Sequence, residues 1–164
     1  MFSFYCRGMN WVDMAKLKVK DIVDGRIEYL RTKTMRKNAS SFSIKINAPI
    51  QSILDIYIKD KKPDDYIFPI VNRDEDPEEM RKDIKNGLKY CNKDLKTIAG
   101  LSGIQTILST YVARHSWGTI AKKMGIDISI ISDGYGHKTS DITATYLDTI
   151  ENAEIDKANE LIVA

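Results

Sequence analysis

Two short stretches, Thr110-Tyr-Val-Ala-Arg-His-Ser-Trp117 and Gly134-Tyr-Gly-His137, decide the fold to which this chain is assigned. In the first, Tyr111, Arg114 and His115 fall at positions i, i+3 and i+4, so a helix would carry all three on one face. Such a face can aim a phenol, a guanidinium and an imidazole at one point. Taken alone, the pattern is also typical of a helix whose Tyr and His are core residues with satisfied polar tips.

The second stretch puts a glycine-flanked histidine, His137, at the predicted end of a helix. There it can lie close to a backbone or to a phosphate. Tyr146 follows nine residues later, and His137 itself follows Arg114 by 23 residues. One tyrosine among eight is by itself most often structural. The order of arginine, histidine and tyrosine at these offsets is what makes Tyr146 a candidate functional residue.

This order resembles the second half of the tyrosine recombinase (phage integrase) signature, which has His-x-x-Arg-His, then Leu-Gly-His, then a nucleophilic tyrosine. The resemblance implies that Tyr146 is the nucleophile and that Arg114 holds the phosphate. It implies that His137 donates to the phosphate or helps to remove the tyrosine's proton. Tyr111 stands where the family usually has His, and Tyr135 stands in place of Leu. A phenol can hydrogen-bond a phosphate oxygen but is a poor proton shuttle at neutral pH.

The first half of the family signature is reproduced in part. The segment Asp13-Met-Ala-Lys-Leu-Lys-Val-Lys-Asp-Ile22 resembles the end of the family's Thr-Gly-Leu-Arg-x-x-Glu-Leu segment, with Asp13 in the place of Glu. Asn10 then occupies the position of the family's first arginine. Arg7 lies three residues earlier, one helical turn away, so we expect Arg7 to supply this guanidinium. The alternative is that Arg7 is an exposed surface arginine.

A catalytic lysine is expected at the tip of the hairpin that follows. The family often has Lys-Thr there, and Thr32-Lys-Thr34 occupies the corresponding place. Lys33 is therefore the candidate, with Lys37 as its replacement if the hairpin register differs. Lysines in hairpin turns are usually only solvated, so this assignment depends on the resemblance.

The residue pattern predicts a mainly helical chain with one small antiparallel sheet, an α+β fold, and the resemblance implies the tyrosine recombinase catalytic fold. Helical spacing of apolar residues extends over 2–17, two strands are predicted over 22–30 and 40–46, and a helix over 49–59. Further helices are predicted over 76–100, from 109 or 110 to 124, from 127 to about 133, from 140 or 141 through 146, and over 151–162.

Composition supports an ordinary globular protein. Hydrophobic residues make up 43% and charged residues 29% of the 164 residues, and no apolar run approaches the roughly 18–20 residues of a membrane span. Cys6 and Cys91 lie far apart without metal-type spacing, which favours buried free thiols in a reducing compartment, the cytoplasm. We expect residues 1–164 to form a single catalytic domain, a fragment without the helical DNA-clamping domain that usually precedes it.

Charge gives weak support for a nucleic-acid partner. The net charge is +2, and dedicated DNA-binding proteins are often more basic. Basic residues gather at 31–37 and 81–96, and acidic residues at 74–79 and 148–156. Such runs indicate either a polarised surface or ordinary solvated faces.

The resemblance implies a site-specific recombinase or integrase, from a mobile element, that cuts and rejoins double-stranded DNA through a 3′-phosphotyrosyl bond. No cofactor or metal is expected, since the sequence has neither P-loop glycines nor a metal-type cluster. The amphipathic helix expected at 152–163 would either pack on its own domain or dock into a neighbour, linking subunits in a tetramer. Two other functions remain open, a type IB topoisomerase and a non-catalytic DNA-binding protein that kept the fold.

Overall fold

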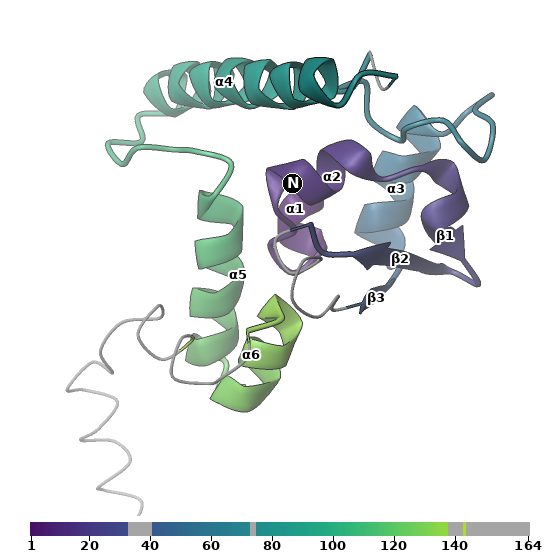
Figure 1. Ribbon diagram of the computed structural model, residues 1–164. Helices are drawn as coiled ribbons and strands as arrows, with labels where there is room; N and C mark the ends of the chain where they lie inside the picture. The colour runs from purple at the N-terminus through teal and green to yellow at the C-terminus, as the bar shows by residue number, and fades with distance from the viewer. Residues whose placement is uncertain (33–40, 73–74, 138–142, 144–164) are drawn as a thin grey trace, which may run out of the picture. The chain divides into compact units, whose positions relative to one another are not determined.

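The computed structural model describes residues 1–32, 41–72, 75–137 and 143 (Figure 1). The chain divides into two compact units, Met1–Ile120 and Ala121–Ala164. Within the described residues most elements are helices, and the strands form one three-stranded antiparallel sheet. The predicted α+β class is therefore confirmed. None of the described helices is long and apolar enough to cross a membrane.

The sheet is built from β1 (Ile22–Val23), β2 (Arg26–Leu30) and β3 (Ser41–Lys45), in that order. Asp24 and Gly25 both have positive φ angles, 47° and 71°, which suit the tight turn of a two-residue hairpin. The turn divides the predicted strand over 22–30 into β1 and β2. The predicted strand over 40–46 is confirmed as β3.

The main core lies in the first unit, against one face of this sheet. Ile27 of β2 pairs with Ile44 of β3, and both side chains are buried. The helix α3 (Ala48–Tyr57) contributes Ile50 and Leu54, which are fully buried in the same cluster. Asn47 caps α3 by accepting a hydrogen bond from the backbone of Ile50, so the predicted helix over 49–59 is confirmed.

The long helix α4 (Pro77–Leu101) begins where the sequence predicts. Asp76 caps it by accepting from the backbone N–H of Glu78 at 2.8 Å. Trp11 joins α4 to the N-terminal region because its indole N–H donates to the carbonyl of Ile84 at 2.9 Å. Gly87 permits this approach, since a Cβ there would lie 3.1 Å from the Trp11 ring.

The helical spacing over 2–17 corresponds to two short helices and not to one. The chain forms α1 (Phe2–Tyr5) and α2 (Trp11–Lys16), separated by a turn at Arg7 and Gly8 with φ angles of 56° and 70°. Ser3 closes this turn by donating its hydroxyl to the carbonyl of Met9 at 2.7 Å. The helical spacing is nevertheless continued across the turn, because Cys6 and Met9 between the two helices are buried as well.

The helices α5 (Val112–Lys123) and α6 (Ile128–Tyr135) follow, and both agree with the predicted ranges to within a turn. Asp127 caps α6 by accepting from the backbone N–H of Ser129 at 2.7 Å. Gly136 ends it in the left-handed conformation with φ 63°. The helices predicted through 146 and over 151–162 lie outside the described residues, apart from the single residue Thr143.

The two cysteines differ in their surroundings. Cys6 is 1% exposed within the core cluster, and burial raises the pKa of its thiol to about 12, although the charge of Arg7 opposes this. Cys91 on α4 is only partly buried. A raised pKa in the folded state stabilises the protein below the unfolded thiol's value, near 9, and this contribution is lost as the pH rises toward 12.

We therefore expect the Cys6 thiol to react with a thiol reagent only after unfolding. In a Cys91→Ser variant at pH 8, labelling by Ellman's reagent should be at least about 1,000-fold slower in buffer than in denaturant, because the native fold must open first. In the matched Cys6→Ala variant, Cys91 should react without denaturant. Rapid native labelling of Cys6 would contradict the burial described here.

Candidate active site

Arg114 is fixed by a close contact with the turn between α1 and α2. It lies in the first turn of α5, is 5% exposed, and donates from Nη1 to the carbonyl of Gly8 at 3.1 Å. A Cβ on Gly8 would lie only 2.5 Å from the Arg114 Cα and 2.7 Å from its Cβ. Gly8 is therefore needed both for its positive φ and for its lack of a side chain.

Tyr111 and His115 lie beside Arg114 in sequence but differ from it in exposure. Tyr111 directly precedes α5 and is 48% exposed, and its ring meets that of His115 edge to face at 4.8 Å. His115 is also exposed. The predicted helical spacing thus brings Tyr111 and His115 together at the surface, whereas the Arg114 side chain is buried.

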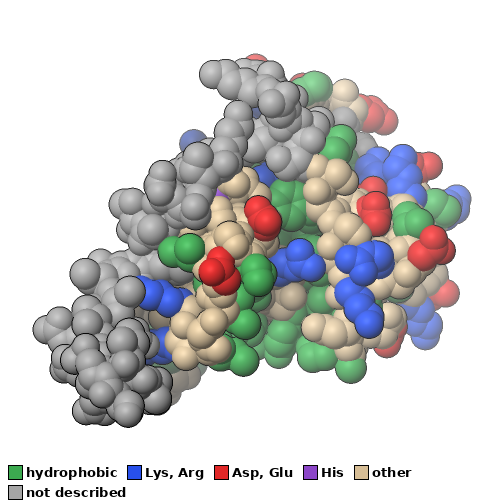
Figure 2. Space-filling model, turned by 90° about the horizontal axis from the view of Figure 1, so that it is seen from below, with side chains coloured by type: hydrophobic (Ala, Val, Ile, Leu, Met, Phe, Trp, Pro, Cys, Tyr) green, Lys and Arg blue, Asp and Glu red, His purple; other side chains and the backbone are tan. Residues whose placement is uncertain are grey.

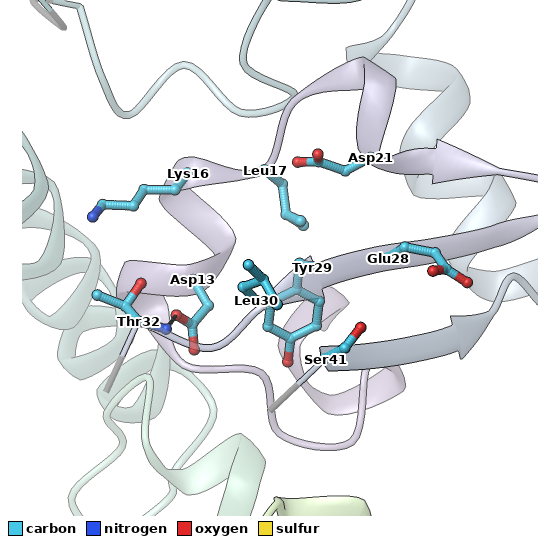
Figure 3. A pocket seen from close by; sticks show the side chains of 9 residues that line it. All are labelled: Asp13, Lys16, Leu17, Asp21, Glu28, Tyr29, Leu30, Thr32 and Ser41. Atoms are coloured by element: carbon cyan, nitrogen blue, oxygen red, sulfur yellow. Dashed lines mark hydrogen bonds between the residues drawn. The ribbon is translucent and has the colours of Figure 1, made fainter. Parts of the chain in front are cut away.

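A second group of polar side chains lies at the C-terminal end of β2. The Asp13 carboxylate is 4% exposed and accepts from the backbone N–H of Thr32 at 2.9 Å. This bond joins α2 to the segment after β2. Figure 3 shows Asp13 between Thr32 and Tyr29 on the wall of an open pocket, which Lys16 also lines.

Tyr29 is surrounded by charged groups. Its ring stacks on Phe42 of β3 with centroids 5.2 Å apart. Burial raises the pKa of its phenol well above the usual value, and the negative charge of Asp13 raises it further. The positive charges of Arg31 and Arg114 oppose this increase.

Sequence analysis did not single out Tyr29 or Arg31. The signal that could have revealed them is the alternation along β2, where buried Ile27 and half-buried Tyr29 alternate with exposed Glu28 and Leu30. The alternation continues one residue beyond the strand, so that Arg31 is buried, with 7% of its surface exposed. A buried arginine at this position conflicts with the usual preference for solvent.

Arg7 lies in the turn between α1 and α2 rather than on a helix. It is partly buried, and its φ of 56° belongs to the left-handed region. The one-turn relation that placed Arg7 on the same face as Asn10 therefore does not hold, since Asn10 is the residue that precedes α2. The role of Arg7 at the site stays a prediction.

His137 lies in the second unit, directly after the left-handed Gly136 that ends α6. Its backbone N–H donates to the carbonyl of Ser132 at 3.0 Å. Its ring lies 5.3 Å from that of Tyr135, which is fully buried. Nδ1 is 2.8 Å from the hydroxyl of Thr143, so the ring orientation is fixed on one side. Thr143 is fully buried and precedes Tyr146 by three residues.

Three of the candidate residues lie outside the described residues: Lys33, its replacement Lys37, and Tyr146. Among the residues that are described, no group of three or more His, Cys, Asp or Glu side chains is arranged to hold a metal ion. On the face drawn in Figure 2, basic and acidic side chains are interspersed rather than separated into areas of one sign.

The sequence profile of the phage integrase family matches residues 4–152. The chain belongs to the phage integrase family. The family match includes the positions of Arg114, His137 and Tyr146, and it extends across both units.

Several characterised proteins are similar to this phage integrase family member. A tyrosine recombinase of Pseudothermotoga lettingae is 22% identical over 161 residues, which are 97% of this chain and 51% of that protein. The XerA recombinase structure shares the fold with a TM-score of 0.66 and 19% identity, over 96% of this chain and 54% of its own. A XerH recombinase bound to a palindromic difH substrate, a post-cleavage complex, has a TM-score of 0.62 and 18% identity, over 96% and 44% of the two chains. This chain thus spans about half the length of the proteins it matches.

The contact between Gly8 and Arg114 leads to a testable difference between two glycines. Gly8→Ala should lower the free energy of unfolding by about 3 kcal/mol, because it combines a strained φ with a clash against Arg114. Gly25→Ala is the matched control, since Gly25 has nearly the same φ of 71° but no atom within 4 Å of an added Cβ. It should cost about 1 kcal/mol.

Urea unfolding followed by circular dichroism measures both values. Equal losses for the two variants would mean that Gly8 is required only for its backbone conformation and not for the approach of Arg114.

Proposed function

We propose that this chain is the catalytic part of a site-specific DNA recombinase that cuts and rejoins double-stranded DNA. Membership of the phage integrase family supports this function. The observation that carries it is the buried Arg114, whose guanidinium is held by the Gly8 carbonyl before any substrate binds. A preorganised cation of this kind suits the negative charge that develops on a phosphodiester under attack.

In the proposed reaction the phenol oxygen of Tyr146 attacks the scissile phosphorus. A bond forms between this oxygen and phosphorus, and the bond from phosphorus to the 5′-oxygen of the next nucleotide breaks. The phenol proton leaves with the help of His137, and Lys33 gives a proton to the departing 5′-oxygen. The 5′-hydroxyl of a second strand reverses these steps and rejoins the DNA. The phosphotyrosyl bond conserves the energy of the broken bond.

The surroundings of the candidate residues support these roles. Thr143 holds Nδ1 of His137, which orients the ring so that Nε2 can be aimed at the phosphate. Tyr111 is exposed at the start of α5, where its hydroxyl can bond a phosphate oxygen. Arg7 is the candidate from the sequence for a second guanidinium.

We propose double-stranded DNA as the partner, with a tetramer as the assembly that exchanges strands and with the helix expected at 152–163 as a link between subunits. XerH, one of the similar structures, is bound to a palindromic difH substrate. Most of the affinity for DNA is expected from phosphate contacts, so binding should weaken steeply with salt. A mobile element is the proposed source.

The experiment that tests this function looks for a covalent protein–DNA adduct. The full polypeptide is incubated with nicked suicide duplexes drawn from the DNA that flanks its own gene, and the products are separated under denaturing conditions. The wild-type protein should form an adduct, and Tyr146→Phe should abolish it because the attacking oxygen is gone. Tyr90→Phe is the matched control, since Tyr90 is exposed on α4, and it should leave the adduct unchanged.

An adduct that persists in Tyr146→Phe would refute the assignment of the nucleophile. Salt-sensitive DNA binding without any adduct would favour the non-catalytic DNA-binding protein, which is consistent with Asn10 in the place of the family's first arginine.

A further inference from the structure

The candidate site has one fixed guanidinium, Arg114, although the family signature has two. Asn10 occupies the position of the missing arginine, and its amide carries no charge. Arg7 lies in a left-handed turn and is not held on the helical face that was expected to present it. Besides Arg7, the fold offers another arginine for the second guanidinium.

Arg31 and Arg114 are the buried cations among the described residues, with 7% and 5% of their surfaces exposed. Burying a guanidinium is costly unless nearby negative charge compensates for it. The buried carboxylates of the same set are Asp13 and Asp83. Asp83 lies on α4 and accepts from the backbone N–H of Asn72 at 2.9 Å, so Asp13 is the buried carboxylate beside the segment of Arg31.

The two buried arginines are joined to one stretch of the chain. Arg114 donates to the carbonyl of Gly8 at 3.1 Å, and Thr32, the residue after Arg31, donates to the carboxylate of Asp13 at 2.9 Å. Both arginines are therefore joined to the same short stretch, Gly8 to Asp13, and both lower the pKa of the Tyr29 phenol, against the larger effect of burial. Tyr29 is held by its stacking on Phe42, and Arg31 follows it by two residues on the same buried face. Two guanidinium groups held by one short stretch of chain suit the two non-bridging oxygens of a phosphate.

The hydrogen bond from the Thr32 backbone to Asp13 fixes the segment that carries Arg31. This bond is 2.9 Å long and joins the end of β2 to α2, where Asp13 occupies the position of the family's Glu. The backbone of Arg31 is thus held on both sides, by β2 before it and by Asp13 after it. A guanidinium on such a support is preorganised, as transition-state stabilisation requires.

We propose that Arg31 supplies the second guanidinium of the site and, together with Arg114, binds the non-bridging oxygens of the scissile phosphate as negative charge develops on them. This assignment rests on the proposed function, since it concerns the same reaction. Asp13 is a positioning residue in this arrangement, because it holds the Arg31 segment and does not touch the phosphate.

The test compares two substrates that differ in charge at the scissile position. One suicide duplex has the natural phosphate, and the other has a neutral methylphosphonate, in which a methyl group replaces one non-bridging oxygen. With the natural phosphate, Arg31→Ala should slow single-turnover adduct formation roughly 100- to 1,000-fold, as expected for loss of one oxyanion donor. With the neutral substrate, Arg31→Ala and wild type should react at similar rates, because only one non-bridging oxygen remains to develop negative charge and Arg114 alone can balance it.

Two further variants separate this role from a purely structural one. If Arg31 only neutralises Asp13, the double variant Asp13→Asn/Arg31→Met should recover cleavage, whereas in our proposal it stays slow. Arg31→Lys keeps the positive charge if Arg31→Ala does not fold, and it should show a smaller defect that also disappears on the neutral substrate. Thermal melting of each variant measures folding separately from cleavage.

A defect of equal size on both substrates would overturn the proposal, as would recovery of cleavage in the double variant. It would also be overturned if Arg31→Ala reacts like wild type while Arg7→Ala shows the charge-dependent defect. If the wild-type protein forms no adduct with the phosphate duplex, the proposed function itself is contradicted. A wild-type adduct that forms equally fast in Arg31→Ala would instead contradict only the role of Arg31.

Discussion

The candidate site depends on the contact between the Gly8 backbone and Arg114. This contact joins two segments 106 residues apart, and it leaves no space for a side chain on Gly8. It fixes the turn between α1 and α2 and also the guanidinium that the first turn of α5 carries. The position of α2 then determines where Asp13 lies, and Asp13 in turn holds the end of β2. The contact between Gly8 and Arg114 is thus linked, through α2 and Asp13, to the end of β2.

Local signals in the sequence were enough to predict the helices that begin at a clear cap. Asp76 before Pro77 marks the start of α4, and Asp127 marks the start of α6. In each case the carboxylate accepts a backbone N–H within two residues, so the information lies in the adjacent sequence. The helices α4 and α6 and the small sheet could be predicted for the same reason, because alternation and helical spacing are properties of short segments.

The break between α1 and α2 could not be predicted in this way. Apolar positions on one side of two short helices have nearly the same spacing as in one long helix, so the pattern is unchanged by the turn. The turn lies against Arg114, a long-range contact at Gly8 that no local pattern contains. The same limit applies to Arg31, whose burial depends on how the end of β2 meets α2. The family resemblance pointed to Arg114, His137 and Tyr146 as site residues. It could not point to Arg31, because the family signature has no residue at that position.

The buried charges suggest how stability and substrate binding are related in this protein. Burying the guanidinium groups of Arg31 and Arg114 costs free energy, which nearby negative charge offsets. In the proposed arrangement, an anion bound by Arg31 and Arg114 would add to this compensation. By linkage, a ligand that binds only the folded state stabilises it, so a phosphodiester at this point should both complete the site and stabilise the fold around it. Natural proteins commonly accept such local costs at the positions where they act on a substrate.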